Sequence, residues 1–253
     1  DNANVRTNGL RYNQSNGVGL KNTAGGACIQ SNCQHLRISR LQAVTASTPY
    51  SIGGLNHGVI LTDLLGECSV TNGVVYGLNA ENGSDALSLY NCLAIHSAGG
   101  ATSRGFEIGA EGFLDDLRVV GCMAVVLSNL TAGSVGFPNN SVTGSGTEIM
   151  KSCAFFGFTT PVNGAAWDSS SGFNATDAAS GLPGSNNQHS VTYTATTPFT
   201  QADGTGTLDL RSIAGTSLIN NGFLDSTNAP NDISGTARDS TPTIGVWEVL
   251  AAA

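Results

Sequence analysis

The chain has 253 residues, a formal net charge of −8 and a charged share of only 11%, against roughly 25% in an average soluble domain. Nucleic-acid affinity rests largely on Lys and Arg that neutralise phosphates, and the ten basic residues here are scattered, so the composition argues against a nucleic-acid partner. No run of about 18 apolar residues occurs, which argues against a membrane-spanning helix.

Apolar residues alternate in short runs that Gly, Asn, Ser and Asp interrupt, and this pattern predicts many short β-strands. The first runs lie between residues 9 and 32 and read as the sides of stacked coils. Amphipathic stretches long enough for a helix are hard to find. We therefore predict helical structure only as single turns near 62–65 and 176–179.

Eight-residue words recur along the chain and align without gaps. They are LRISRLQA (36–43), LSLYNCLA (87–94), LRVVGCMA (117–124) and EIMKSCAF (148–155), with DLLGECSV (63–70) as a looser copy. Adjacent copies lie 24 to 31 residues apart, which is typical of solenoid repeats and too short for the four strands of a propeller blade. Because no helix accompanies the repeat, each copy predicts part of one coil in a parallel β-helix.

The inward-facing positions of the repeat switch at its fifth residue. Positions one and three are mostly apolar, and so are positions six and eight, so the chain must bend between them. The fifth position holds Asn91, Gly121 and Ser152 in three of the copies. Gly and Asn suit such a corner, because Gly lacks a Cβ atom and Asn tolerates the left-handed conformation. We therefore predict that Asn91 is the corner of a coil.

The sixth position places Cys68, Cys92, Cys122 and Cys153 in one inward column, which Leu41 also joins. Free cysteine packs as a small buried hydrophobe, so we predict a stack of interior thiols. Disulfides between adjacent coils are the alternative, because a strand spacing of about 4.8 Å permits a bridge, although parallel side chains suit its torsion poorly. No CxxC motif and no Cys/His pairing at ligand spacing occurs, so we predict neither a metal nor a cofactor.

The chain divides into an array of coils and a closing segment. The coils cover residues 1–215, with a long polar loop region near 159–190 and one more pair of strands in 190–199 and 207–213. The C-terminal segment, 216–253, follows them. An open solenoid end exposes an unpaired edge that would recruit other chains, so we expect this last segment to act as a cap.

The last segment contains SLINNGF (217–223), DISGTAR (232–238) and IGVWE (244–248). These words resemble the closing motif of many secreted and phage β-helix proteins, in which D-x-x-G-x-x-R is followed by I-G-A-x-E; Val246 replaces the usual Ala. With the repeated words, they resemble the right-handed parallel β-helix, or pectin-lyase-like, superfamily. The resemblance implies an all-β fold, a right-handed parallel β-helix with a C-terminal cap.

Three residues of the closing motif have expected roles in this cap. We expect Arg238 and Glu248 to pair across the final turn, and Trp247 to cover apolar side chains. A ligand site in the same segment is the alternative.

Asp115 and Asp116, with Glu111 close by in the sequence, are the candidate catalytic residues. A glycosidase needs two carboxylates about 5–9.5 Å apart, and a β-helix lyase needs a basic residue beside acidic residues that hold a cation. Adjacent acidic residues at a loop-to-strand junction are more often solvated turn formers, and the motif set of polygalacturonase-type hydrolases is absent. The four histidines are dispersed and form no triad or metal motif.

Low charge, the missing catalytic set and the phage-like ending favour a non-enzymatic structural protein of a tailed bacteriophage, a head decoration, fibre or spike component on the virion surface. The opening residues show no signal-peptide pattern, which favours the same assignment. Expected partners are other virion proteins, with a cell-surface glycan as an alternative, and the resemblance implies homo-oligomers that are trimers in many spikes. A polysaccharide lyase or hydrolase (a depolymerase) and an extracellular or cell-surface bacterial adhesin are the alternative functions.

Overall fold

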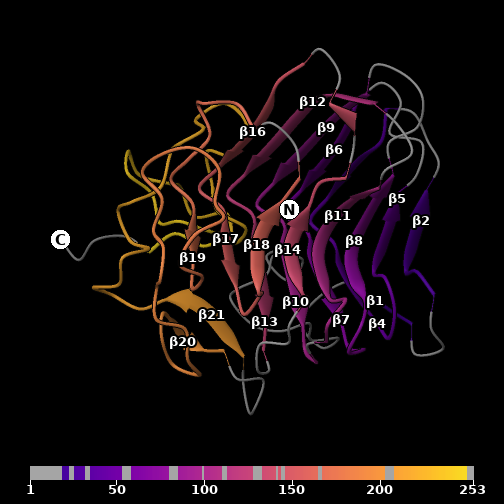
Figure 1. The fold of residues 1–253 in the computed structure, drawn as a ribbon, viewed down its shortest axis with the longest axis horizontal. Coiled ribbons are helices and arrows are strands. Elements are labelled where there is room, and N and C mark those ends of the chain that lie inside the picture. The colour runs from indigo at the N-terminus through magenta and orange to yellow at the C-terminus, as the bar shows by residue number, and fades with distance from the viewer. Residues whose placement is uncertain are drawn as a thin grey trace.

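The computed structural model describes residues 19–22, 26–31, 35–52, 58–79, 85–98, 100–109, 113–127, 133–140, 142–143, 146–164, 167–202 and 208–249 (Figure 1). Over these residues the chain forms β-strands and no helix, so no described segment is a helix that could span a membrane. The two predicted helical turns are wrong. Residues 62–65 contain the end of one strand and the start of the next, and residues 177–179 form a bend after a strand.

Three parallel sheets, which we call I, II and III, run along the stack, and successive strands of most coils belong to different sheets. Sheet I contains β1 (Gly19–Asn22), β4 (Gln42–Thr45), β7 (Leu65–Cys68), β10 (Leu93–His96), β13 (Met123–Val126), β17 (Ala154–Phe156) and β19 (Ala175–Thr176). Sheet II contains β2 (Ile29–Ser31), β5 (Tyr50–Ile52), β8 (Val74–Asn79), β11 (Arg104–Gly109), β14 (Val135–Pro138) and β18 (Thr160–Asn163). Sheet III contains β3 (Arg37–Ser39), β6 (Val59–Thr62), β9 (Asp85–Tyr90), β12 (Phe113–Val120), β15 (Val142–Thr143) and β16 (Glu148–Lys151).

Each strand of these sheets pairs in parallel with a strand one coil away, which confirms the predicted all-β parallel β-solenoid. In Figure 1, sheet II runs from β2 at the right to β18 near the centre, so the coils stack along the horizontal axis. A separate antiparallel hairpin, β20 (Phe199–Gln201) and β21 (Asp209–Ser212), follows the coils.

A corner in the left-handed conformation joins sheet III to sheet I. The corner residues are Arg40, Asp63, Asn91, Gly121, Ser152 and Phe173, with φ between 51° and 63°. This conformation is costly for most L-residues and costs least for Gly and Asn. The prediction that Asn91 is a coil corner is confirmed, and the corner recurs in coils whose sequences carry no Asn or Gly there.

The register places three of the four aligned cysteines in one interior column. Parallel pairing of β10, β13 and β17 stacks Cys92, Cys122 and Cys153, which directly precede these strands, and all three are buried free thiols. Cys68 is also buried and free, but it lies beside His96 of the neighbouring coil, at the far end of its own strand. The prediction that Cys68 shares the column of the other three is therefore wrong.

Leu64 occupies the position that the looser repeat assigned to Cys68. The repeat of this coil is VILTDLLG (59–66), because Asp63 aligns with the corner Asn91 across sheet III. The predicted alignment of 63–70 placed Cys68 opposite Cys92, whereas the strand register aligns the corner residues Asp63 and Asn91. The residue after the corner can be Leu or Cys, because both fill a small apolar site.

A column of aromatic rings fills the interior beside sheet II. Tyr50, Tyr76, Phe106 and Phe137 stack in successive coils, with ring centroids 4.7, 4.7 and 5.8 Å apart. The Tyr76 hydroxyl lies 3.1 and 3.0 Å from two backbone carbonyl oxygens, so this buried polar group is satisfied. The rings recur every 26 to 31 residues, within the 24 to 31 residue interval of the repeated words. The spacing of these aromatic residues in the sequence is therefore a signal for this column.

The C-terminal segment lies along the flank of the stack. Residues 217–249, which we call the strap, place Ile244 and Val246 in the same buried cluster as Leu93 and Met123 of sheet I. These sheet residues point outward, because their neighbours Ala94 and Ala124 belong to the interior cluster and side chains alternate along a strand. The closing segment therefore packs on the outer face of sheet I.

We expect Cys122→Ser to lower the free energy of unfolding by about 1–3 kcal/mol, because serine buries a hydroxyl among apolar side chains. Cys28→Ser is the control, since Cys28 is only half-buried and the change there should cost less. Urea unfolding of both variants measures the difference, and equal losses would contradict the interior placement. Reductant should leave the parent protein's unfolding midpoint unchanged, because the described cysteines are free.

Candidate functional site

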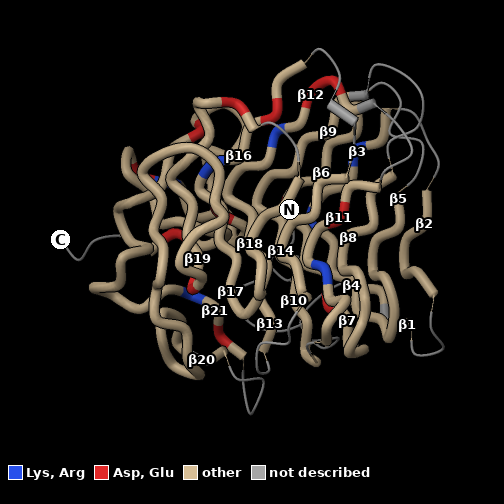
Figure 2. The backbone as a smooth tube through the Cα atoms, viewed as in Figure 1, with Lys and Arg blue, Asp and Glu red and all other residues tan. Residues whose placement is uncertain are grey.

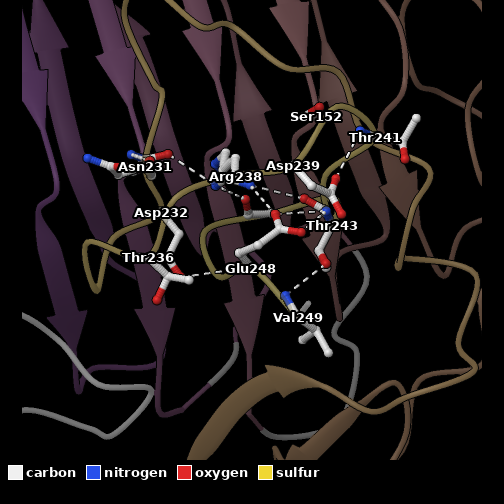
Figure 3. Close-up of polar contacts among 12 residues, drawn as sticks. Ser152, Asn231, Asp232, Thr236, Arg238, Asp239, Thr241, Thr243, Glu248 and Val249 are labelled. Atoms are coloured by element: carbon white, nitrogen blue, oxygen red, sulfur yellow. Dashed lines mark hydrogen bonds and ion pairs between the residues drawn. The ribbon is translucent and has the colours of Figure 1, made fainter. Parts of the chain in front are cut away.

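One buried ion pair fixes the strap against the coil corners (Figure 3). Arg238 Nη1 lies 3.6 Å from Glu248 Oε2, and the two side chains are 2% and 0% exposed. Arg238 Nη2 donates to Asn91 Oδ1 at 3.2 Å and to Gly245 O at 2.7 Å, while Nη1 donates to Thr243 O at 3.1 Å. The expected Arg238–Glu248 pair is present, and it also ties the closing motif to a coil corner that is distant in the sequence.

Gly121 makes room for this anchor at the next corner of the column. A Cβ atom at this position would lie 2.7 Å from Asn91 Oδ1 and 3.1 Å from Arg238 Nη2. Its φ of 63° also favours glycine. This corner therefore serves both the bend of the coil and the seating of the strap.

Burial dominates the electrostatics of the ion pair. It raises the pKa of Glu248 to about 7, although the backbone N–H of Thr243 and the guanidinium of Arg238 act in the opposite direction. Burial also lowers the pKa of Arg238, against the attraction of Glu248 and Asp232. The cost of removing both charged groups from water offsets much of the attraction between them. The Arg238–Glu248 pair therefore fixes the geometry of the strap more than it adds to the free energy of unfolding.

Asp232 closes the turn that presents this arginine. Its Oδ1 accepts from the Thr236 N–H and from the Ser234 hydroxyl, both at 2.7 Å, and its Oδ2 accepts from the Glu248 N–H at 2.9 Å. Gly235 within the turn has a φ of 89°, which glycine adopts readily. The D-x-x-G-x-x-R stretch is thus a hydrogen-bonded turn that aims a guanidinium at the coils.

Trp247 covers apolar side chains, as expected. It is 4% exposed and belongs to the cluster between the strap and sheet I, together with Phe156 and Leu218. Its indole Nε1 has no hydrogen-bond partner among the described residues. The ring therefore acts through the apolar surface that it buries.

The outer face of sheet III carries a second concentration of polar chemistry. Arg37 and Arg118 share one outward column of the register, Lys151 lies in the next column, and Arg40 is at the corner. Figure 2 shows basic positions beside β3 and β16 in a chain that is acidic overall. This face thus gathers cations that are separated by up to 114 residues of sequence, from Arg37 to Lys151.

The strap crosses this face and divides it into grooves. Ala229 of the strap packs on Tyr90 and Val120 of sheet III. A groove of about 360 Å³ lies over β3, β6 and β9 beside this crossing, and one of about 270 Å³ lies over β12 and β16. A third groove, of about 390 Å³, lies over β9, β12 and β16 and is lined in part by Asp116 and Ser88.

Asp225 holds the strap to sheet III. Its carboxylate lies 3.5 Å from Arg118 Nη1 and accepts from the side-chain amide of Asn228 at 3.1 Å. Burial raises the pKa of Asp225, but the Asn228 amide, two backbone N–H groups and Arg118 lower it by more, so it lies below its usual value. Beside it, the Lys151 ammonium sits 4.0 Å from the centroid of the Phe223 ring, a cation–π contact.

The candidate catalytic residues Asp115 and Asp116 fall at an irregularity in the pairing of β12. The register with β9 shifts between Leu114 and Asp116, and Asp115 lies at that shift. Asp116 is exposed in the 390 Å³ groove, where its Oδ1 accepts from the Thr147 N–H at 3.1 Å. Glu111 lies outside the described residues. Of the described residues that line this groove, Asp116 is the one carboxylate.

The grooves offer guanidinium, carboxylate, hydroxyl and carboxamide groups, which suit hydrogen bonding to a polar ligand. Within the described stretches, no group of three or more His, Cys, Asp or Glu side chains could hold a metal ion. The described part of this face therefore presents charged groups, hydroxyls and a carboxamide.

No family model, curated protein or solved structure matches this chain. The assignment to the parallel β-solenoids therefore rests on the strand register and the repeated left-handed corners.

Sequence reasoning missed the contribution of the strap to this face. Asp225 and Arg118 are 107 residues apart, and no local pattern connects them. The alternation within 87–94 and 117–124 does identify the outward residues of sheet III, and it is the signal that could have located the grooves.

We expect the titration of Glu248 to raise the free energy of unfolding as the pH falls from about 8 to about 5. The folded-state pKa of Glu248, about 7, lies above its usual value of 4.5, so over this range the folded protein takes up a proton that the unfolded chain does not. The stabilisation is at most about 3 kcal/mol, at roughly 1.36 kcal/mol per pKa unit. Urea unfolding at a series of pH values measures it.

Glu248→Gln keeps an acceptor for the Thr243 N–H and removes this titration, so its stability should vary less with pH than that of the parent. Glu107→Gln, on strand β11 of sheet II, is the matched control and should retain the parent's pH dependence. The assignment fails if Glu248→Gln and Glu107→Gln respond to pH alike.

Proposed function

We propose that the protein is a non-enzymatic structural component of a virion surface, in a tailed bacteriophage, as a head decoration, fibre or spike. Its partners are then other virion proteins and further copies of itself, in a homo-oligomer of which the trimer found in many spikes is one form. The low charge, the phage-like closing motif and a solenoid whose flank is sealed by its own strap support this proposal.

One observation carries the non-enzymatic part of the proposal: the carboxylates described on the grooved face of sheet III are already engaged. Asp225 is paired with Arg118. Asp63 accepts from Asn91 Nδ2 at 3.0 Å and lies 4.0 Å from a guanidinium. Asp116 accepts from a backbone N–H. Carboxylates used as structural acceptors favour a scaffold over a pair of acids arranged for glycoside hydrolysis.

Rigidity is the second supporting feature. The interior is a continuous apolar cluster along the coils, and the aromatic column runs through it. The buried ion pair and Asp225 hold the strap at both ends of its path over the corners. Such a body suits a particle exposed to solvent and mechanical load.

Mass spectrometry of purified phage particles tests this function. We expect the chain in fixed stoichiometry with capsid or tail protein, because a structural component is built in at defined sites. Its absence from particles, together with a secretion signal and anchor in the parent gene, would instead support the adhesin alternative.

The groove over Asp116 and Arg118 is the observation that favours the depolymerase alternative. We expect the purified protein to cleave no glycan from the host surface, and Asp115→Ala/Asp116→Ala to change neither folding nor this result. Glu107→Ala serves as a matched acidic control on another sheet. Reducing-end or unsaturated-product assays give the readout, and glycan cleavage that only the double variant abolishes would replace the structural assignment with an enzymatic one.

A further inference from the structure

A pocket of about 290 Å³ lies where the strap passes the last turns of the corner column. Phe173 and Asn186 are successive corners there, with φ of 58° and 57°, and the Phe173 N–H donates to the carbonyl oxygen of Ser185. Asn220 of the strap, with φ of 57°, also lines the pocket. The pocket is therefore built from the same left-handed corners that shape the coils.

The groups that line this pocket are uncharged. They include five carboxamides, those of Asn186, Asn187, Gln188, Asn220 and Asn221. The Thr241 hydroxyl and the Phe173 ring complete the polar and apolar parts of the lining. No charged side chain is among the described residues that line it, in contrast to the grooves on sheet III.

Two of the carboxamides are committed to the walls. Asn187 donates to two backbone carbonyl oxygens at 3.0 and 3.2 Å, and its Oδ1 accepts from the Asn174 N–H at 2.9 Å. Asn221 donates to two further carbonyl oxygens at 3.1 and 3.0 Å. The Gly222 N–H donates to the carbonyl oxygen of Pro242 at 2.7 Å and joins two segments of the strap. The walls are thus held without a ligand, which lowers the cost of binding.

The other three carboxamides are available. Asn186, Gln188 and Asn220 make no side-chain hydrogen bond within the described part of the chain, and Asn186 and Asn220 are exposed. The Phe173 ring contacts the Phe223 ring, with centroids 6.0 Å apart. The pocket therefore presents free donors and acceptors next to a fixed aromatic surface.

We propose that this carboxamide pocket binds one neutral sugar residue of a glycan. A sugar hydroxyl both donates and accepts, as a carboxamide does, and the C–H face of a pyranose packs on an aromatic ring. An ionic ligand would be left without a counter-charge in this lining. The volume is at the small end of ligand sites, which suits a single ring. Sugar binding at this pocket does not depend on virion assembly.

The test is titration of the ¹⁵N-labelled full chain with glucose, galactose, mannose and N-acetylglucosamine, followed by NMR of the side-chain amide signals. We expect at least one sugar to shift the Asn186, Gln188 and Asn220 signals, with a dissociation constant on the order of millimolar. Galacturonate, inorganic phosphate and tri-alanine, tested in the same way, should leave these signals in place.

Asn186→Gly and Asn220→Gly remove a free carboxamide without straining the left-handed backbone, which glycine tolerates. Each change should weaken sugar binding severalfold, and both together about tenfold. Ser88→Ala, in a groove of sheet III, is the control and should bind as the parent does. Urea unfolding confirms that the variants fold.

The proposal is overturned if no neutral sugar shifts these signals, if the double variant binds as well as the parent, or if only the anions or the peptide bind.

Discussion

The left-handed corner between sheets III and I is the constraint on which the rest of the structure depends. Because the chain reverses its facing there, the residue after the corner points inward, as Cys92 does, while the corner side chain itself stays outside. Asn91 uses that outward position to bond Asp63 of one coil and Arg238 of the strap. The column of corner residues therefore both links neighbouring coils and attaches the strap to them.

The strap covers apolar side chains that the coils leave on the outer face of sheet I. Strands β10 and β13 of sheet I carry apolar side chains on both faces, so one set fills the interior and the outer set would be exposed to water without a cover. Covering the outer set accounts for the apolar half of the strap, including Ile244 and Trp247. Its polar half crosses the corners, shapes the grooves of sheet III and closes the carboxamide pocket. The segment that buries the outer face of sheet I thus also contributes polar side chains to the grooves of sheet III and to the carboxamide pocket.

Much of the fold could be predicted from periodicity, and the errors have a common physical origin. Asn91 is correctly placed as a corner, because a small turn residue between two apolar pairs is a local signal. Cys68 is misplaced, because an interior site accepts either Leu or Cys and residue identity does not fix register. The aromatic column at Tyr50 and Tyr76 shares the repeat interval and could have been found. The position of the strap could not, since its contacts join residues more than a hundred positions apart.

The sequence by itself determined the class of fold, the repeat, the corner at Asn91 and the pairing partners Arg238 and Glu248. These follow from alternation, spacing and charge, which act within one coil or one short motif. Only the tertiary structure decided which face the strap covers, where Asp225 meets Arg118, and that carboxamides from the last coil and the strap line one pocket. Those outcomes depend on how the outer surface of the whole stack is buried. The sequence of a single coil does not specify which distant segment packs against its outer face.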